Sequence, residues 1–323
     1  MIQGTARHWQ VREYTPADIP ANVELSNLEY SDEPTTLEQE EHWERSYPQG
    51  NPRLRLAVDD EANRLIGIGA TLKPFWADAP GVFNLFILVH PRERGRGIGR
   101  DLLARLEAYA AGQGAEKLWT DCRESQARSI RFLERTGFHQ FGIRYESAID
   151  LTRFDPARFA YALERAEAAG YRIATLAELR KERPEVEREL YEVENTALKD
   201  VPLPGGAEFN MAFEQWRKNL DNPAADPAFF FIALHEDRIV GLTALELLQD
   251  GPAITDATGV TRDHRNRGVA LALKVRSLAA LKEIGRTEAR THNDTANPAI
   301  LHLNDKLGYA RLPGWMQWEK RLG

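Results

Sequence analysis

The hydrophobic positions in the first half of the chain fall into short blocks separated by polar turns. Continuous or alternating apolar blocks are typical of strands, whereas apolar residues at steps of three and four are typical of helices. Strands are predicted at Trp9–Tyr14, Leu54–Asp59, Leu65–Lys73, Val82–Val89, Leu118–Cys122 and Phe141–Leu151. Helices are predicted up to about Tyr47, after Gly97, where Ile98, Leu102 and Leu106 share one face, and over Ala127–Thr136.

The same order of elements returns in the second half. Strands are predicted at Tyr171–Thr175, Phe229–His235, Ile239–Leu248, Ile254–Val260, Glu288–His292 and near Trp315–Lys320. Helices are predicted up to about Leu220, over Leu271–Ile284 and over Pro298–Leu307. A further helix, Phe154–Ala169, has Pro156 near its start and Gly170 just past its end, and it links the halves. We therefore predict a first domain at 1–153, a linking helix at 154–170 and a second domain at 171–323.

Four landmarks of the first half recur 171 positions later, which indicates a duplicated domain. They are the pairs Val89 and Val260, Arg94 and Arg265, Thr120 and Thr291, and Gly137 and Gly308. Nearer the start of each half the register slips, and the second half carries extra residues around Leu198–Pro227. Because recognition residues often lie on such variable segments, we expect this insertion to influence which substrate is accepted.

Each half contains a strand that runs into an Arg-rich turn, and the turn opens a helix. The first turn is Arg94-Gly95-Arg96-Gly97-Ile98-Gly99 and the second is Arg265-Asn266-Arg267-Gly268-Val269-Ala270. A turn of this kind directs unpaired backbone N–H groups and the positive end of the helix dipole at one point, which suits a phosphate. It is not a dinucleotide fingerprint, because Arg100 occupies the place of the third glycine, and no P-loop lysine follows. A single copy could equally be a tight connection, but the repetition favours an anion site.

Composition narrows the function further. The chain has 323 residues, 42% hydrophobic and 28% charged, with a net charge of −7, which argues against nucleic acid as a partner. There is no apolar run long enough for a membrane span and no signal-peptide pattern at the N-terminus. One cysteine, Cys122, fits a reducing environment, so a cytoplasmic protein without a membrane partner is expected. With no HExxH spacing and a single thiol, no metal site is predicted.

The paired turns resemble the acyl-CoA loop of the GNAT superfamily of N-acetyltransferases, whose pattern is Gln/Arg-x-x-Gly-x-Gly/Ala. Segments Ala127–Phe138 and Ala299–Tyr309, with their Gly-aromatic ends, resemble the second motif of that family. The layout is similar to that of tandem GNAT proteins such as the mycothiol synthases. The resemblance implies an α/β (α+β) fold of two tandem GNAT acyl-CoA N-acyltransferase domains. Each would have a mixed, mostly antiparallel central sheet flanked by helices.

The resemblance also implies how acetyl-CoA is held. The backbone N–H groups of the six residues in each turn would bind the pyrophosphate. The edges of the strands at Leu88–Val89 and Gly259–Val260 would pair with the pantetheine amides, and the next strand would splay away to open the slot. Gln126 and Asn297 lie where the family often places an Asn that contacts pantetheine.

The implied activity is acetyl-CoA-dependent acetylation of the primary amine of a small molecule, by direct attack of the amine on the thioester. The family often has a Tyr as acid to the thiolate, but Leu133 and Asn304 stand at those positions. Family bases often lie on the strand before the loop, where Leu85 is apolar, whereas Asp256 and Thr258 would share a face with Val260 by two-residue alternation. Asp256 is therefore the candidate base and the C-terminal domain the expected catalyst. A carboxylate there could equally make a strand-end hydrogen bond.

Two alternatives stay open. One is a non-catalytic acyl-CoA-binding or regulatory module, and the other is a catalytic C-terminal domain beside a structural N-terminal one. The sequence identifies neither the acceptor amine nor the oligomeric state. Aromatic residues that could line an acceptor pocket are more often core residues, and they are Tyr30, Trp43, Trp76, Phe209, Trp216 and Trp315.

Overall fold

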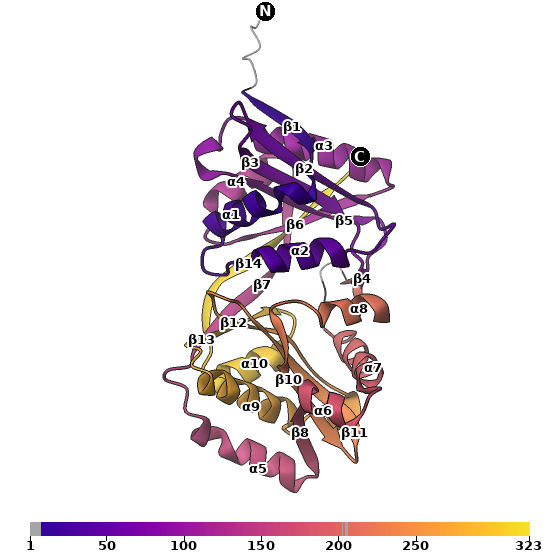
Figure 1. The fold of residues 1–323 in the computed structure, drawn as a ribbon, viewed down its shortest axis with the longest axis vertical. Coiled ribbons are helices and arrows are strands. Elements are labelled where there is room, and N and C mark those ends of the chain that lie inside the picture. Colours follow the sequence, from indigo (N-terminus) through magenta and orange to yellow (C-terminus); the bar gives the residue numbers. More distant parts are fainter. Residues whose placement is uncertain (1–7, 202, 204–205) are drawn as a thin grey trace, which may run out of the picture.

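The two halves of the chain stack along the long axis of the molecule and share one sheet (Figure 1). The computed structural model describes residues 8–201, 203 and 206–323. The strands of the first half are β1 (Trp9–Glu13), β2 (Arg53–Asp60), β3 (Leu65–Leu72), β4 (Ala77–Asp78), β5 (Val82–Val89), β6 (Lys117–Arg123) and β7 (His139–Asp150). Its helices are α1 (Ile19–Glu29), α2 (Leu37–Ser46), α3 (Ile98–Gly112) and α4 (Ala127–Arg135).

The second half repeats this order. Its strands are β8 (Tyr171–Thr175), β9 (Glu208–Phe209), β10 (Ala225–His235), β11 (Arg238–Leu247), β12 (Ala253–Val260), β13 (Glu288–Asp294) and β14 (Ala310–Arg321). Its helices are α5 (Ala160–Ala168), α6 (Leu176–Glu182), α7 (Val186–Leu198), α8 (Phe213–Asn219), α9 (Val269–Glu283) and α10 (Pro298–Leu307). No helix within the described ranges is long and apolar enough to cross a bilayer.

The sheet has twelve strands in the order β1-β2-β3-β5-β6-β14-β7-β13-β12-β11-β10-β8. This order reads the same from both edges once each strand is replaced by its counterpart in the other half, as a duplicated chain requires. The pairs β5–β6 and β12–β13 are parallel and the other pairs are antiparallel. The mixed, mostly antiparallel sheet flanked by helices confirms the predicted fold class.

The halves exchange their last strands at the centre of the sheet. β14, from the end of the chain, lies between β6 and β7, and β7 from the first half pairs with β13 (Figure 1). A cut within 154–170 would therefore separate β14 from the part of the sheet that contains β6. The ranges 1–153, 154–170 and 171–323 stay a prediction.

The predicted helical faces form the core. Ile98, Leu102 and Leu106 are at most 1% exposed, and α3 packs on β3 and β5. The equivalent helix α9 buries Leu273 and Leu278 completely against β10 and β11. Burying a leucine side chain stabilises a fold by roughly 1.5–3 kcal/mol. This packing holds the start of each helix, and hence each Arg-rich turn, in place.

Three local features differ from the sequence predictions. Two-residue strands β4 and β9 form a small ribbon between the halves, with Ala77 opposite Phe209, and such short strands leave no periodic signal. The linking helix opens with a 3-10 turn at Pro156–Phe159, and α5 begins at Ala160. Strand β10 begins at Ala225, ahead of the predicted Phe229, because pairing resumes on the far side of an irregular stretch.

Candidate active site

Both Arg-rich turns form the expected cradle in front of a helix. Gly97 and Gly268 have φ values of +102° and +85° and directly precede α3 and α9. Gly95 and its counterpart Asn266 also have positive φ, at +88° and +61°, a region that asparagine tolerates better than most residues. A Cβ built on Gly268 meets nothing within 4 Å, and one on Gly97 comes no nearer than 3.8 Å to Trp9. The space before each helix is therefore open to an anion.

The side chain of the first arginine of each turn holds the turn against the end of the preceding strand. Arg94 Nε donates to the carbonyl oxygen of Val89 at 2.8 Å, and Arg265 Nε donates to that of Val260 at 2.9 Å. Each guanidinium also forms an ion pair, Arg94 with Glu29 and Arg265 with Asp200. The sequence analysis named both arginines for their backbone N–H groups, and those groups stay the predicted phosphate ligands. The side chains hold the turn in place.

A slot opens beside each cradle because the parallel strands separate. Pairing of β5 with β6 covers Val82–Asn84, and pairing of β12 with β13 covers Ala253–Thr255. Beyond these points the strands pair only with β3 and β11 on their other side. One backbone edge at Leu88–Val89 and at Gly259–Val260 is thus left unpaired, as binding of a pantetheine chain in the manner of an added strand requires.

In the first half, a cavity of about 590 Å³ runs along this slot. Its cationic lining residues are Arg94, Arg100, Arg128, Arg131 and Arg135. Cys122 also lines it but is 3% exposed, and burial raises the pKa of its thiol to about 11. The Gln126 carboxamide donates to Glu29 at 2.7 Å and accepts from the Arg123 amide at 2.9 Å. The cavity thus offers positive charge for phosphates, while Leu85 and Leu133 give it apolar walls.

In the second half, Asn304 and Asn293 stand 171 positions after Leu133 and Cys122, and with Lys274 they form a buried polar network. Asn304 Oδ1 accepts from Lys274 Nζ at 2.9 Å, and Asn304 Nδ2 donates to Asn293 at 2.7 Å. Lys274 is 1% exposed, and burial lowers its pKa to about 7. Asn297 caps α10 by accepting from the Ile300 amide at 3.3 Å. Asn304 therefore has a structural role and does not replace a tyrosine acid, because a carboxamide does not titrate.

A second cavity, of about 500 Å³, lies between the halves. The first half contributes residues of α2 and of the loop after β3, and the second half contributes α7, α8 and β10 to β12. Its aromatic lining residues are Trp43, Tyr47, Phe75, Trp76, Phe209, Trp216 and Phe230. Four of the six aromatic residues named in the sequence analysis therefore line this cavity. The inserted segment Leu198–Pro227 supplies much of the wall, as its proposed role in substrate choice requires.

Asp256 lies at the point where this cavity meets the slot. It follows Thr255, the last residue of β12 that pairs with β13, and it is the extra residue of a bulge between Thr255 and Ala257. Its carboxylate is exposed to the cavity, yet the surrounding protein removes most of the water and raises its pKa. Within the described ranges it forms no hydrogen bond and no ion pair. The strand-end hydrogen bond considered as an alternative is therefore not formed.

The bulge also corrects the predicted strand face. Two-residue alternation placed Thr258 beside Asp256, but Thr258 Oγ1 lies 2.8 Å from Thr243 Oγ1 on the neighbouring strand. The bulge inserts one residue into β12, so the alternation shifts at that point.

Two further carboxylates, which sequence reasoning missed, share the cavity with Asp256. Glu194 on α7 accepts from Trp216 Nε1 at 2.9 Å, and Glu246 on β11 accepts from Asn222 Nδ2 at 3.0 Å. Burial and, to a smaller extent, the charge of Asp256 raise the pKa of each to about 7. The lining residues that the structure describes include no lysine or arginine. The arrangement can hold cationic groups and accept a proton near neutral pH.

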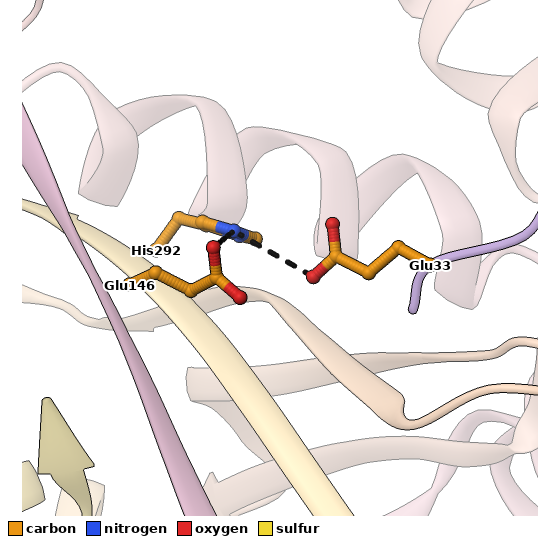
Figure 2. Close-up of side chains that lie close together, drawn as sticks. All are labelled: Glu33, Glu146 and His292. Carbon is orange, nitrogen blue, oxygen red and sulfur yellow. Dashed lines mark ion pairs between the residues drawn. The ribbon is translucent and has the colours of Figure 1, made fainter. Parts of the chain in front are cut away.

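Outside the two cavities, a cluster of charged side chains joins the two halves. Glu33, Glu146 and His292 point toward one another (Figure 2), with His292 Nε2 3.9 Å from Glu33 and 3.7 Å from Glu146. These groups have the chemistry of a metal-binding trio, which sequence reasoning did not anticipate. Arg290 donates to Glu146 at 3.0 Å, and Arg123 pairs with Glu33 at 3.0 Å. Because two guanidinium groups already neutralise the carboxylates, we interpret the cluster as an ion-pair network.

Comparison with known proteins identifies the family. The sequence profile of the acetyltransferase (GNAT) family matches residues 19–138. Over 151 residues the chain is 30% identical to phosphinothricin N-acetyltransferase of Streptomyces coelicolor, covering 87% of that protein and 44% of this chain. The chain belongs to the GNAT family of N-acetyltransferases.

Other relatives extend the similarity of this GNAT enzyme over both halves. It is 26% identical over 275 residues to mycothiol acetyltransferase of Thermobifida fusca, covering 81% of each protein. A tandem GNAT protein from the clavulanic acid biosynthesis pathway superposes with a TM-score of 0.75 at 19% identity, covering 98% of this chain and 99% of that one. A GCN5-related N-acetyltransferase from Sphaerobacter thermophilus superposes with a TM-score of 0.70 at 23% identity, covering 99% of this chain and 97% of that one. The tandem GNAT arrangement is thus a property of the whole chain.

Proposed function

We propose that this enzyme transfers the acetyl group of acetyl-CoA to the primary amine of a small molecule, and that the second half is the catalyst. The observation that carries the proposal is the unpartnered Asp256 carboxylate, at the point where the slot meets a cavity with carboxylate and aromatic walls. Relatives named as acetyltransferases of mycothiol and of phosphinothricin support acetyl transfer as the reaction class.

The residues present fit acetyl-CoA. The backbone N–H groups of Arg265–Ala270 would hold its pyrophosphate, since the space before α9 is open and Gly268 keeps the turn in a positive-φ conformation. The unpaired edge at Gly259–Val260 would bind pantetheine. When bound, acetyl-CoA supplies the reactive thioester.

Asp256 acts as the proton acceptor in this proposal. An amine is an ammonium ion at neutral pH and must lose a proton before it can attack a carbonyl. A carboxylate whose pKa is raised by burial keeps that proton better than an exposed aspartate does. Since neither Leu133 nor Asn304 can donate a proton, we assign protonation of the departing thiolate to water.

The first half is proposed to bind acyl-CoA without transferring the acetyl group. Its cradle and arginine-lined cavity fit the same ligand, but Leu85 stands 171 positions before Asp256, so the base is missing. A second candidate function, a non-catalytic acyl-CoA-binding module, is favoured by the absence of the tyrosine acid in both halves.

Release of free thiol from acetyl-CoA tests the proposal. The purified protein would be assayed with a panel of polyamines, amino-sugars, aminoglycosides and amino acids, and binding of coenzyme A would be measured on the same preparation. Turnover with at least one amine is expected. Coenzyme A binding without turnover on the whole panel would favour the binding module instead.

A further inference from the structure

The cavity between the halves is lined by more carboxyl groups than one ammonium ion can neutralise once they are ionised. Asp256 is flanked by Glu194 and Glu246, which come from different elements and both interact with its charge. His42 also lines the cavity, and burial lowers its pKa, so it is neutral at pH 7. Asp226 adds a fourth carboxylate to the lining. Within the described part of the chain, the lining contains no lysine or arginine that would offset these groups.

The rest of the wall suits an apolar cation. Trp76, Phe230 and Trp216 are among the rings that line the same space as the carboxylates. Aromatic faces attract cations and also bind methylene chains. They offer no positive charge to a carboxylate or a phosphate, and buried negative groups would repel such groups strongly.

We propose that the acceptor is an organic diammonium compound, which carries a second cationic group besides the amine that is acetylated and carries no carboxylate or phosphate. This inference rests on the proposed function, because it identifies the substrate of that site. The amine to be acetylated lies at Asp256, next to the slot. The second cationic group is bound by Glu246 or Glu194, and the aromatic walls contact the spacer between them.

The proposal excludes acceptors that carry an acidic group. An acidic amine would place its anion among the carboxylates of the cavity, with no lysine or arginine of the lining to receive it. A monoamine, which carries a single ammonium group, would leave at least one of the two glutamates to be neutralised by a proton.

Three ligands of equal length test the inference, namely 1,5-diaminopentane, 1-aminopentane and 5-aminopentanoate. Their binding is measured by calorimetry at pH 8, where the glutamates are mostly ionised, with and without saturating coenzyme A. We expect the diamine to bind at least tenfold more tightly than the monoamine, and the zwitterion not to bind at millimolar concentration. Equal affinity for diamine and monoamine, or binding of the zwitterion at the diamine's affinity, would overturn the proposal.

Two isosteric variants locate the second cation. Glu246→Gln or Glu194→Gln should lower diamine affinity about tenfold and change monoamine affinity little. Glu164→Gln, on the exposed side of α5, removes the same charge far from the cavity and should change neither. A diamine preference that survives both cavity variants overturns the proposal. Because binding is read without turnover, a diamine that binds but is not acetylated contradicts only the proposed function, whereas acetylation without diamine preference contradicts only this inference.

Discussion

The substitution Asp256→Asn removes the proposed proton acceptor and leaves the shape of the cavity unchanged. An alkyl amine has a pKa of about 10.4, so at pH 7.4 only about one molecule in 10³ is already deprotonated. A positioned general base contributes about 10²–10⁴-fold to such reactions. We therefore expect kcat/KM of the variant to fall by about 10²–10³-fold at pH 7.4.

The pH profile distinguishes loss of a base from a general disturbance. In the variant, the enzyme must use amine that has already lost its proton in solution. Because that fraction rises about tenfold per pH unit between pH 7 and 9, kcat/KM should rise by the same factor. In the wild type, activity should fall on the acid side as Asp256 takes up a proton, at a pH above the ordinary aspartate pKa because burial raises it. Thiol release across pH 6–10 measures both, with Glu164→Gln as the control. A variant with the wild-type profile at every pH would refute the role of Asp256.

Two further predictions concern groups around the site. Burial lowers the pKa of Lys274 to about 7, so above pH 7 the unfolded chain binds more protons than the folded one. The free energy of unfolding from urea titrations should therefore rise by about 1 kcal/mol per pH unit between pH 7.5 and 8.5. Lys274→Met should abolish this rise, and a wild-type value independent of pH would contradict the assignment. Arg265→Lys keeps the charge but loses the two-pronged brace to Val260 and Asp200, so acetyl-CoA affinity should fall about tenfold or more, as charge-assisted hydrogen bonds contribute about 1.5–3 kcal/mol. The matched change Arg94→Lys should lower acetyl-CoA affinity at the first cradle instead. Unchanged binding constants in both variants would show that these arginine contacts are unimportant for binding.

The features that could be predicted from the sequence are those encoded within one short segment. Each cradle is such a segment, since a strand, a positive-φ glycine and an amphipathic helix follow one another directly. Asp256 was found because it lies on the strand that leads into the second cradle. Its position in a bulge was not found, because a bulge is set by the pairing of β12 with β11.

The features that could not be predicted depend on contacts between distant segments. The cavity combines Trp43 and Trp76 of the first half with Glu194 and Glu246 of the second, and no periodicity links these residues. The exchange of β7 and β14 could not be predicted for the same reason, because the pattern of a strand does not show which other strand it pairs with. The carboxylates that brace the cradles, Glu29 and Asp200, lie 171 positions apart, so a search for acidic pairs in the repeat register could have found them.

Calorimetric titration with acetyl-CoA shows whether each of the two main-chain cradles binds a CoA molecule. A side chain at Gly97 or Gly268 would be strained by the positive φ and would project into the open space before the helix. We expect two binding events in the wild type and one in each of Gly97→Val and Gly268→Val, with the variants shown to be folded by thermal melting. Absence of heat with the wild type, or two undiminished binding events in both variants, would show that the cradles are not the CoA sites.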